Sequence, residues 1–235
     1  MQHFEPSFAP AKPTAAEYNF ADIYEILKQE IIDLTAKPGS LMSENPLCKR
    51  FGVSRTLIRG VLQTLQEEEL VEIVPYKGTW VTLLNFDIVN QLIFERVAVE
   101  SRVLREFIAT ASDGDFALIA KRLLRHEEIM RQKPLDLNRL YAQDSLLHET
   151  WFAATGKLYL WKNLQNAHAD YSRFRMLDTL EDANFEEVVA DHRLLIQLIT
   201  EKRTAEIEGL IERHLYGSIH RLDGKIKTEF THYFK

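Results

Sequence analysis

Four side chains in the second half of the chain have the chemistry of divalent metal ligands. Asp144 and His148 are four residues apart in RLYAQDSLLHETWFA, whereas His192 lies in VVADHRLLIQLI and His214 in EIEGLIERHLYGSI. Apolar residues recur around each of them at helical spacing, so we expect all four on the inner faces of three helices. A buried carboxylate and buried imidazoles destabilise a fold unless they have partners. A bound divalent metal provides such partners, with zinc as the first choice and nickel, iron or manganese as alternatives.

Other interpretations of this set stay open. An interior histidine is often a hydrogen-bonded core residue, and a metal could serve only to hold the helices together. The set could also belong to a metal-dependent enzyme on a helical bundle, such as a hydrolase or a non-heme oxygenase. We recognise no nucleophile, general base or phosphate-binding loop near it, so we expect no enzyme and assign no catalytic residue.

A second polar set lies near the start of the chain, in VSRTLIRGVLQTL. Arg55 and Arg59 are four residues apart, so they project from one side of a helix. An arginine fork binds phosphate or the O6/N7 edge of guanine, and Ser54, Thr56 and the helix N-terminus can hold a phosphate. A small helical domain with a solvated basic face is the alternative. The opposite side of the helix is apolar, with Leu57, Ile58, Val61, Leu62 and Leu65.

The composition is that of a globular protein. The 235 residues carry a formal net charge of -6, and residues 18–84 hold seven Lys and Arg against nine Asp and Glu, so nucleic-acid binding must rest on a local patch. The single cysteine, Cys48, excludes an internal disulfide and fits a reducing cytoplasm. No apolar run reaches the roughly 18 to 20 residues of a membrane span. The Pro- and Ala-containing start has no signal-peptide pattern and predicts a flexible leader over 1–17.

Local signals place the elements of the first half. Residues 20–34 show helical spacing, and KPGS after them predicts a turn. Ser43 or Asn45 can cap a short helix in NPLCKRF that ends at Gly52, and Ser54 can cap the next helix. LVEIVPYKGTWVTLL then predicts a β-hairpin with a Pro-Tyr-Lys-Gly tip. The predicted order is helix, helix, tight turn, helix and hairpin.

The pattern from Asn85 onward is helical throughout. Short connections between consecutive helices favour antiparallel neighbours, so this part predicts a helical bundle. The predicted helical segments are 86–111, 114–132, 136–154, 157–179, 184–201 and 203–228.

The first half resembles the winged helix-turn-helix of the GntR family of bacterial transcription regulators. The matching pieces are "PGS-L", "L-KRFGVSRT-IR-VL-L" and "L-E-----KGT-V", within about 50 residues. The resemblance implies that the helix after Gly52 enters the major groove of DNA, with the hairpin as a wing. The residues expected to contact DNA are Arg50, Ser54, Arg55, Thr56, Arg59, Lys77 and Gly78.

The second half resembles the FCD effector domain of the FadR-type branch of that family. The order and spacing of Asp144, His148, His192 and His214 carry the resemblance, which extends loosely from about residue 87 to 225. It implies that the metal is a docking point for a small carboxylate and not a catalyst. Mainly α architecture follows, with a winged helix-turn-helix DNA-binding domain over 18–84 and an antiparallel, all-helical effector-binding domain over 85–235.

Three further residues are candidates for binding the effector. The resemblance implies that Arg96, on the first helix of the bundle, reaches the carboxylate, and a guanidinium can bind it in bidentate fashion. An Arg96–Glu100 pair on a wet face is the alternative. His168 and Arg175 are expected to line the same cavity, although His168 could be structural or solvent-facing. His126, within RHEE, is expected on a solvated charged face.

The sequence therefore predicts a ligand-responsive, sequence-specific transcription regulator, most simply a cytoplasmic repressor. A homodimer would place two recognition helices about one DNA turn apart and read an inverted repeat in a double-stranded operator. A small carboxylate bound in the helical domain would change the relative placement of the two reading heads. No membrane partner is expected.

Overall fold

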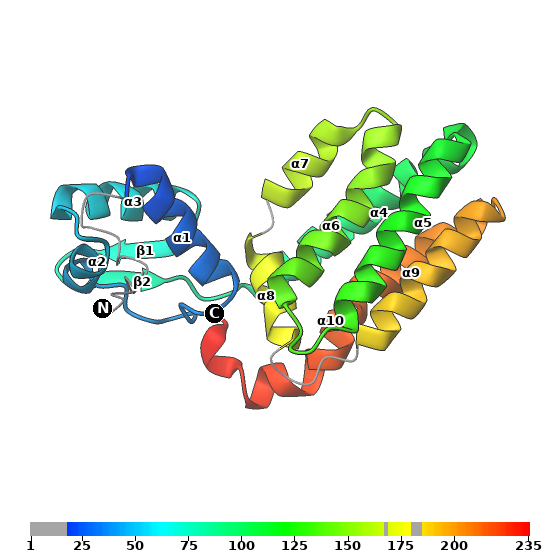
Figure 1. Cartoon of the computed structure of the whole chain (residues 1–235). Helices are drawn as coiled ribbons and strands as arrows, with labels where there is room; N and C mark the ends of the chain where they lie inside the picture. The colour runs from blue at the N-terminus through cyan, green and yellow to red at the C-terminus, as the bar shows by residue number, and fades with distance from the viewer. Residues whose placement is uncertain (1–17, 167–168, 180–184) are drawn as a thin grey trace, which may run out of the picture. The chain divides into compact units, whose positions relative to one another are not determined.

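The computed structural model describes residues 18–166, 169–179 and 185–235. The described chain forms two compact units. The first comprises Gly39–Thr82 and the described residues up to Ile31, and the second comprises Ile32–Pro38 and Leu83–Lys235. The leader predicted over 1–17 lies outside the described residues. The predicted mainly α architecture is confirmed, with a small two-stranded sheet in the first unit and helices in the second (Figure 1).

The first unit has the predicted order of elements. Its elements are α1 (Phe20–Ile32), α2 (Glu44–Phe51), α3 (Arg55–Glu67), β1 (Val71–Val74) and β2 (Gly78–Val81). Gly52 ends α2 with a left-handed φ of 68°, and Ser54 begins α3 by accepting a 3.3 Å hydrogen bond from the Leu57 amide through its Oγ. A glycine C-cap followed at once by a serine N-cap makes the tight turn between the two helices.

The geometry of the hairpin explains why position 78, which is expected to contact DNA, is a glycine. β1 and β2 are antiparallel, and Val74 pairs with Gly78 at the end next to the turn. Gly78 has a φ of 123°, and a Cβ there would lie 2.9 Å from Leu41 Cδ1. A side chain at this position would therefore strain the backbone and clash. Glycine is required here by the turn itself.

The second unit contains seven α-helices within the described ranges. They are α4 (Phe86–Thr110), α5 (Asp113–Met130), α6 (Leu137–Ala154), α7 (Leu158–Asn166), α8 (Ala169–Thr179), α9 (Phe185–Thr200) and α10 (Ile207–Thr228), with short 3₁₀ turns at Thr204–Glu206 and Thr231–Tyr233. The range predicted as one helix, 157–179, contains α7 and α8, and residues 167–168 between them lie outside the described residues.

The long helices of this unit lie side by side and alternate in direction (Figure 1). α5 packs against α6 and α9, whereas α4 packs against α6, α8 and α10. Their inner faces bury large side chains completely, including Phe107 on α4, Trp151 on α6 and Phe174 on α8. The faces of α4, α6, α9 and α10 that carry the candidate site therefore point into one interior. None of the helices in the described ranges combines the length and the apolar character that a membrane crossing needs.

Candidate metal centre and DNA-binding surface

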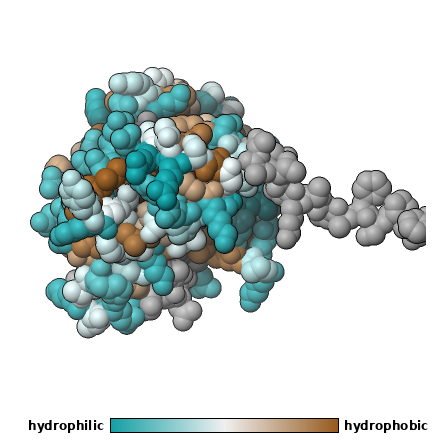
Figure 2. All heavy atoms as spheres, turned by 90° about the vertical axis from the view of Figure 1, so that its left-hand side faces the viewer, coloured by the Kyte–Doolittle hydropathy of each residue, from teal (hydrophilic) through white to brown (hydrophobic). Residues whose placement is uncertain are grey.

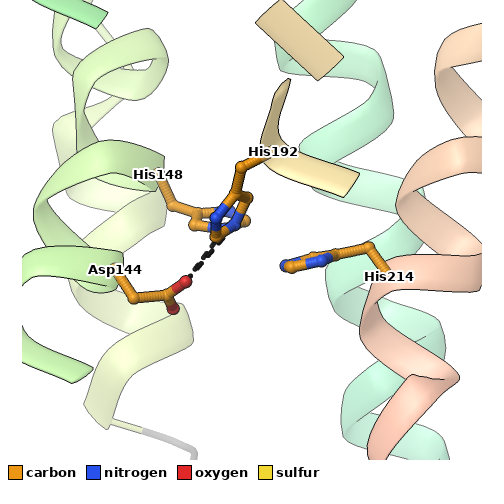
Figure 3. A group of neighbouring side chains, drawn as sticks. All are labelled: Asp144, His148, His192 and His214. Atoms are coloured by element: carbon orange, nitrogen blue, oxygen red, sulfur yellow. Dashed lines mark hydrogen bonds and ion pairs between the residues drawn. The ribbon is translucent and has the colours of Figure 1, made fainter. Parts of the chain in front are cut away.

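The structure brings the four predicted metal ligands together. Asp144 and His148 on α6, His192 on α9 and His214 on α10 point toward one another, and one ligand atom from each lies within 4.8 Å of all the others (Figure 3). Asp144 Oδ1 is 3.3 Å from His192 Nε2 and 3.9 Å from His148 Nε2. The two Nε2 atoms of His148 and His192 are 3.3 Å apart.

These residues fit a divalent ion by geometry and by their unmet hydrogen-bonding needs. Ligands that each lie about 2.1 Å from one ion are separated from one another by roughly 3 to 4 Å. Asp144 Oδ1 is buried and has no hydrogen-bond partner among the described residues. An ion would satisfy that oxygen and the facing imidazole nitrogens together.

Glu100 on α4 orients one of the imidazoles. His148 Nδ1 donates to Glu100 Oε1, which leaves the Nε2 lone pair of His148 directed at the cluster. The same carboxylate accepts from Trp151 Nε1 at 3.1 Å and from Arg96 Nε at 3.0 Å. Burial raises the pKa of Glu100, but His148 and Arg96 outweigh it and lower the pKa to about 2. The Arg96–Glu100 pair, which a wet face would have exposed, is buried, with side chains 4% and 0% exposed.

Two further groups tune the cluster. Arg175 Nη2 on α8 donates to Asp144 Oδ2 at 3.0 Å, and Asp191 Oδ2 lies 3.7 Å from His214 Nδ1. Burial opposes ionisation of Asp144, yet Arg175 and the neighbouring imidazoles hold its pKa well below the usual range. Burial, reinforced by His214, lowers the pKa of His192 far below its ordinary value. An ionised carboxylate and a neutral imidazole are the forms that bind metals.

A cavity of about 40 Å³ adjoins the cluster and is bordered by two of the predicted effector residues. Arg96 and Arg175 both line it, together with Asp144 and His214. The two guanidinium carbons lie 5.6 Å and 5.8 Å from the ring centre of Tyr171, which also borders the cavity. His168, the third predicted effector residue, lies outside the described residues. The cavity thus combines a candidate metal site with one buried cation, Arg96, and one partly buried cation, Arg175.

The prediction that His126 lies on a solvated face is wrong. His126 on α5 is 1% exposed, lines the same cavity and has its ring centre 5.2 Å from that of His192. The charged neighbours in RHEE hid its position, although its spacing from the buried Ile119 and Leu123 puts it on their helix face. Tyr171 was also missed, because no local pattern distinguishes it from a core tyrosine.

The predicted DNA-contacting residues lie on exposed parts of the first unit. The exposed residues are Arg50 on α2, the α3 cap Ser54, Arg55, Thr56 and Arg59 on α3, and Lys77 and Gly78 in the hairpin. The opposite face of α3 is buried through Ile58, Val61, Leu62 and Leu65.

Two of the arginines in this unit carry acidic partners. Arg59 Nε donates to Glu44 Oε1 at 2.8 Å, and Arg50 Nη1 donates to Glu30 Oε2 at 2.9 Å. Figure 2, which looks onto this unit, shows mainly hydrophilic side chains with scattered apolar ones between them. The exposed side chains Arg55, Thr56 and Arg59 make the outer face of α3 polar and accessible at its start.

Comparisons with known proteins follow the division into two units. The family described as "Bacterial regulatory proteins, gntR family" matches residues 20–81, and the FCD domain matches residues 91–217. An HTH-type transcriptional regulator in an unstable DNA locus of Streptomyces ambofaciens is 32% identical over 204 residues, which cover 86% of this chain and 84% of that protein. The HTH-type transcriptional repressor RspR of Escherichia coli (strain K12) is 23% identical, covering 82% and 84%. The solved structure of E. coli McbR/YncC has the same fold, with a TM-score of 0.69 at 14% identity over 88% of this chain and 97% of that one.

Proposed function

Since the chain belongs to the GntR family of bacterial regulatory proteins and carries an FCD domain, we propose that it is a repressor controlled by a small carboxylate bound at a divalent metal. Its relatives are transcriptional regulators, which confirms the prediction of a regulator and not of an enzyme. The name of RspR, a repressor, supports the same direction of control for this chain.

The observation that carries the sensing half of the proposal is the convergence of Asp144, His148, His192 and His214 beside a cavity bordered by Arg96 and Arg175. Zinc is the metal that this donor set favours, with nickel, iron and manganese as alternatives. A bound ion would supply open coordination positions for carboxylate oxygens. The two guanidinium groups would orient the carboxylate and balance its charge.

The outer face of α3 supports the DNA-binding half. Arg55 and Arg59 project from it, where their guanidinium groups would bind guanine edges or phosphates in the major groove. Ser54 and Thr56 would bind phosphate at the start of the helix, with Arg50, Lys77 and Gly78 as flanking contacts. A homodimer would read an inverted repeat. The carboxylate would release or strengthen binding only by favouring one arrangement of the dimer over the other.

The proposal is tested on the full chain, first stripped of metal and then loaded with zinc. We expect one zinc per chain by elemental analysis, and a rise in melting temperature with a panel of small carboxylates that appears only in the loaded protein. Operator fragments selected from random DNA would then be titrated with and without the active carboxylate. If zinc raises the melting temperature and every carboxylate leaves it unchanged, the metal is structural only.

A further inference from the structure

Two neutral polar atoms on the wall of the effector cavity have no partner in the described part of the chain. His126 Nδ1 on α5 and Ser218 Oγ on α10 are both buried, and neither makes a hydrogen bond to a described residue. The side chains are 1% and 5% exposed, and both border the cavity. Buried polar atoms normally have hydrogen-bond partners, so these two indicate a ligand or ordered water.

His126 and Ser218 differ in chemistry from the charged side chains that line the same cavity. The cations Arg96 and Arg175 and the candidate metal match a carboxylate. A neutral imidazole and a hydroxyl can each donate or accept one hydrogen bond, and a ligand hydroxyl complements both. An acid with a plain hydrocarbon chain would leave Nδ1 of His126 and Oγ of Ser218 unsatisfied in a closed site, which weakens binding.

His126 is separate from the proposed metal ligands. The group of His and Asp side chains that could hold an ion in the described residues comprises Asp144, His148, His192 and His214, without His126. His126 comes from α5, which contributes no ligand to that group, and its ring meets the His192 ring edge-on at 70°. It therefore lies next to the ion site, where a group attached to a metal-bound carboxylate would pass.

We propose that His126 and Ser218 select a carboxylate that also carries a hydroxyl group, so that the effector is a hydroxycarboxylic acid. This inference rests on the proposed carboxylate-sensing function and adds to it the class of acid and the residues that distinguish it. The discrimination has a physical basis, because a site that hydrogen-bonds a ligand hydroxyl rejects the analogue that lacks it.

The test uses matched pairs of acids that differ by one hydroxyl: lactate with propionate, and malate with succinate. Dissociation constants are measured by calorimetry on the zinc-loaded full chain. In the wild type we expect the hydroxylated acid of at least one pair to bind about tenfold more tightly or better. Because a 2-hydroxyl can also chelate the metal, the deciding quantity is the change in this preference in the variants.

His126→Phe keeps an aromatic ring and removes the nitrogens, and Ser218→Ala removes only the hydroxyl. We expect each change to reduce the preference for the hydroxylated acid by about three- to tenfold. His126→Asn, whose amide can again hydrogen-bond, should recover part of it. Zinc content and melting temperature confirm that each variant is folded and loaded.

Ser101→Ala is the matched control. Ser101 on α4 is 1% exposed, and its Oγ also has no partner among the described residues, but it does not border the cavity. We expect it to leave the preference unchanged, so a loss in Ser101→Ala equal to that in Ser218→Ala would overturn the assignment.

The failures of the two proposals are distinguishable. If carboxylates bind but each pair binds equally, or if the preference is the same in His126→Phe and Ser218→Ala as in the wild type, this inference is wrong and the sensing function stands. If no acid of either pair binds the zinc-loaded chain, the proposed sensing function fails at these acids and the selection by His126 and Ser218 fails with it.

Discussion

The two units of the chain each contain an arginine–glutamate pair, and the pairs differ in their surroundings. Arg59 and Glu44 in the first unit are 63% and 30% exposed, whereas Arg96 and Glu100 in the second are 4% and 0% exposed. An exposed pair contributes little to stability and exchanges readily with water or another anion. Removal of one partner of a buried pair is strongly destabilising, because the other charge stays buried without a partner. The first unit therefore has side chains that are free to change partners, and the second has side chains that are held in place.

The largest effect is expected for the buried pair. Glu100→Ala leaves Arg96 buried without its carboxylate and removes the acceptor for His148 Nδ1. We expect the free energy of unfolding to fall by about 3 to 5 kcal/mol, measured by urea denaturation. Glu95→Ala, an exposed position on the same helix, is the control and should change it little. An equal fall in the free energy of unfolding in Glu100→Ala and Glu95→Ala would show that the buried pair has no special importance for stability.

The next effect concerns the candidate metal site. His192→Ala removes an imidazole whose Nε2 lies 3.3 Å from both Asp144 Oδ1 and His148 Nε2. We expect zinc affinity to fall by more than the roughly 10- to 100-fold that loss of an outer-shell partner causes. The thermal response to carboxylates should disappear with the zinc. His220→Ala, an exposed histidine on α10, serves as the control. Full zinc content in His192→Ala would contradict the ligand assignment.

A smaller effect is expected on the exposed face of α3. Arg55→Ala and Arg59→Ala should each weaken operator binding by about 1 to 3 kcal/mol if the guanidinium contacts guanine in bidentate fashion. Fluorescence anisotropy with the selected operator and with a scrambled duplex separates a base contact from a phosphate contact. Lys121→Ala, an exposed cation on α5, is the control. Unchanged affinity in both arginine variants would show that this face does not read DNA.

The smallest effect is expected for the partner of Arg59. Glu44→Gln removes the charge that accepts from Arg59 Nε. The free energy of unfolding should change by less than about 1 kcal/mol. Operator affinity should be at least as high as in the wild type, because the guanidinium is released and an anion near the phosphates is lost. Weaker binding would mean that Glu44 positions Arg59 for DNA.

The sequence predicted local features well where a residue's role is decided within one turn of helix. The Gly52 and Ser54 caps, the hairpin and the inward direction of Asp144, His148, His192 and His214 all follow from spacing along one element. The helix periodicity places each side chain on a face, and the apolar residues show which face is buried.

The features that the sequence did not reveal depend on contacts between distant elements. Glu100 and His148 are 48 residues apart, so nothing near Glu100 shows that it is buried beneath an imidazole. His126 shares a face with Ile119 and Leu123, but three charged neighbours obscured that signal. Tertiary packing decides each of these cases.

The hydrogen bonds shared by the Glu100 carboxylate limit which substitutions the chain can accept. It accepts from Arg96, His148 and Trp151 together, so replacing Glu100 leaves three buried donors without this acceptor, and replacing one donor removes one hydrogen bond from a buried carboxylate. Descendants of this chain should therefore keep the quartet intact or replace several members at once. Arg59 is exposed and Glu44 is partly exposed, so either residue can be substituted without a change in the other. Substitutions should accordingly accumulate more readily at Arg59 and Glu44 than around Glu100.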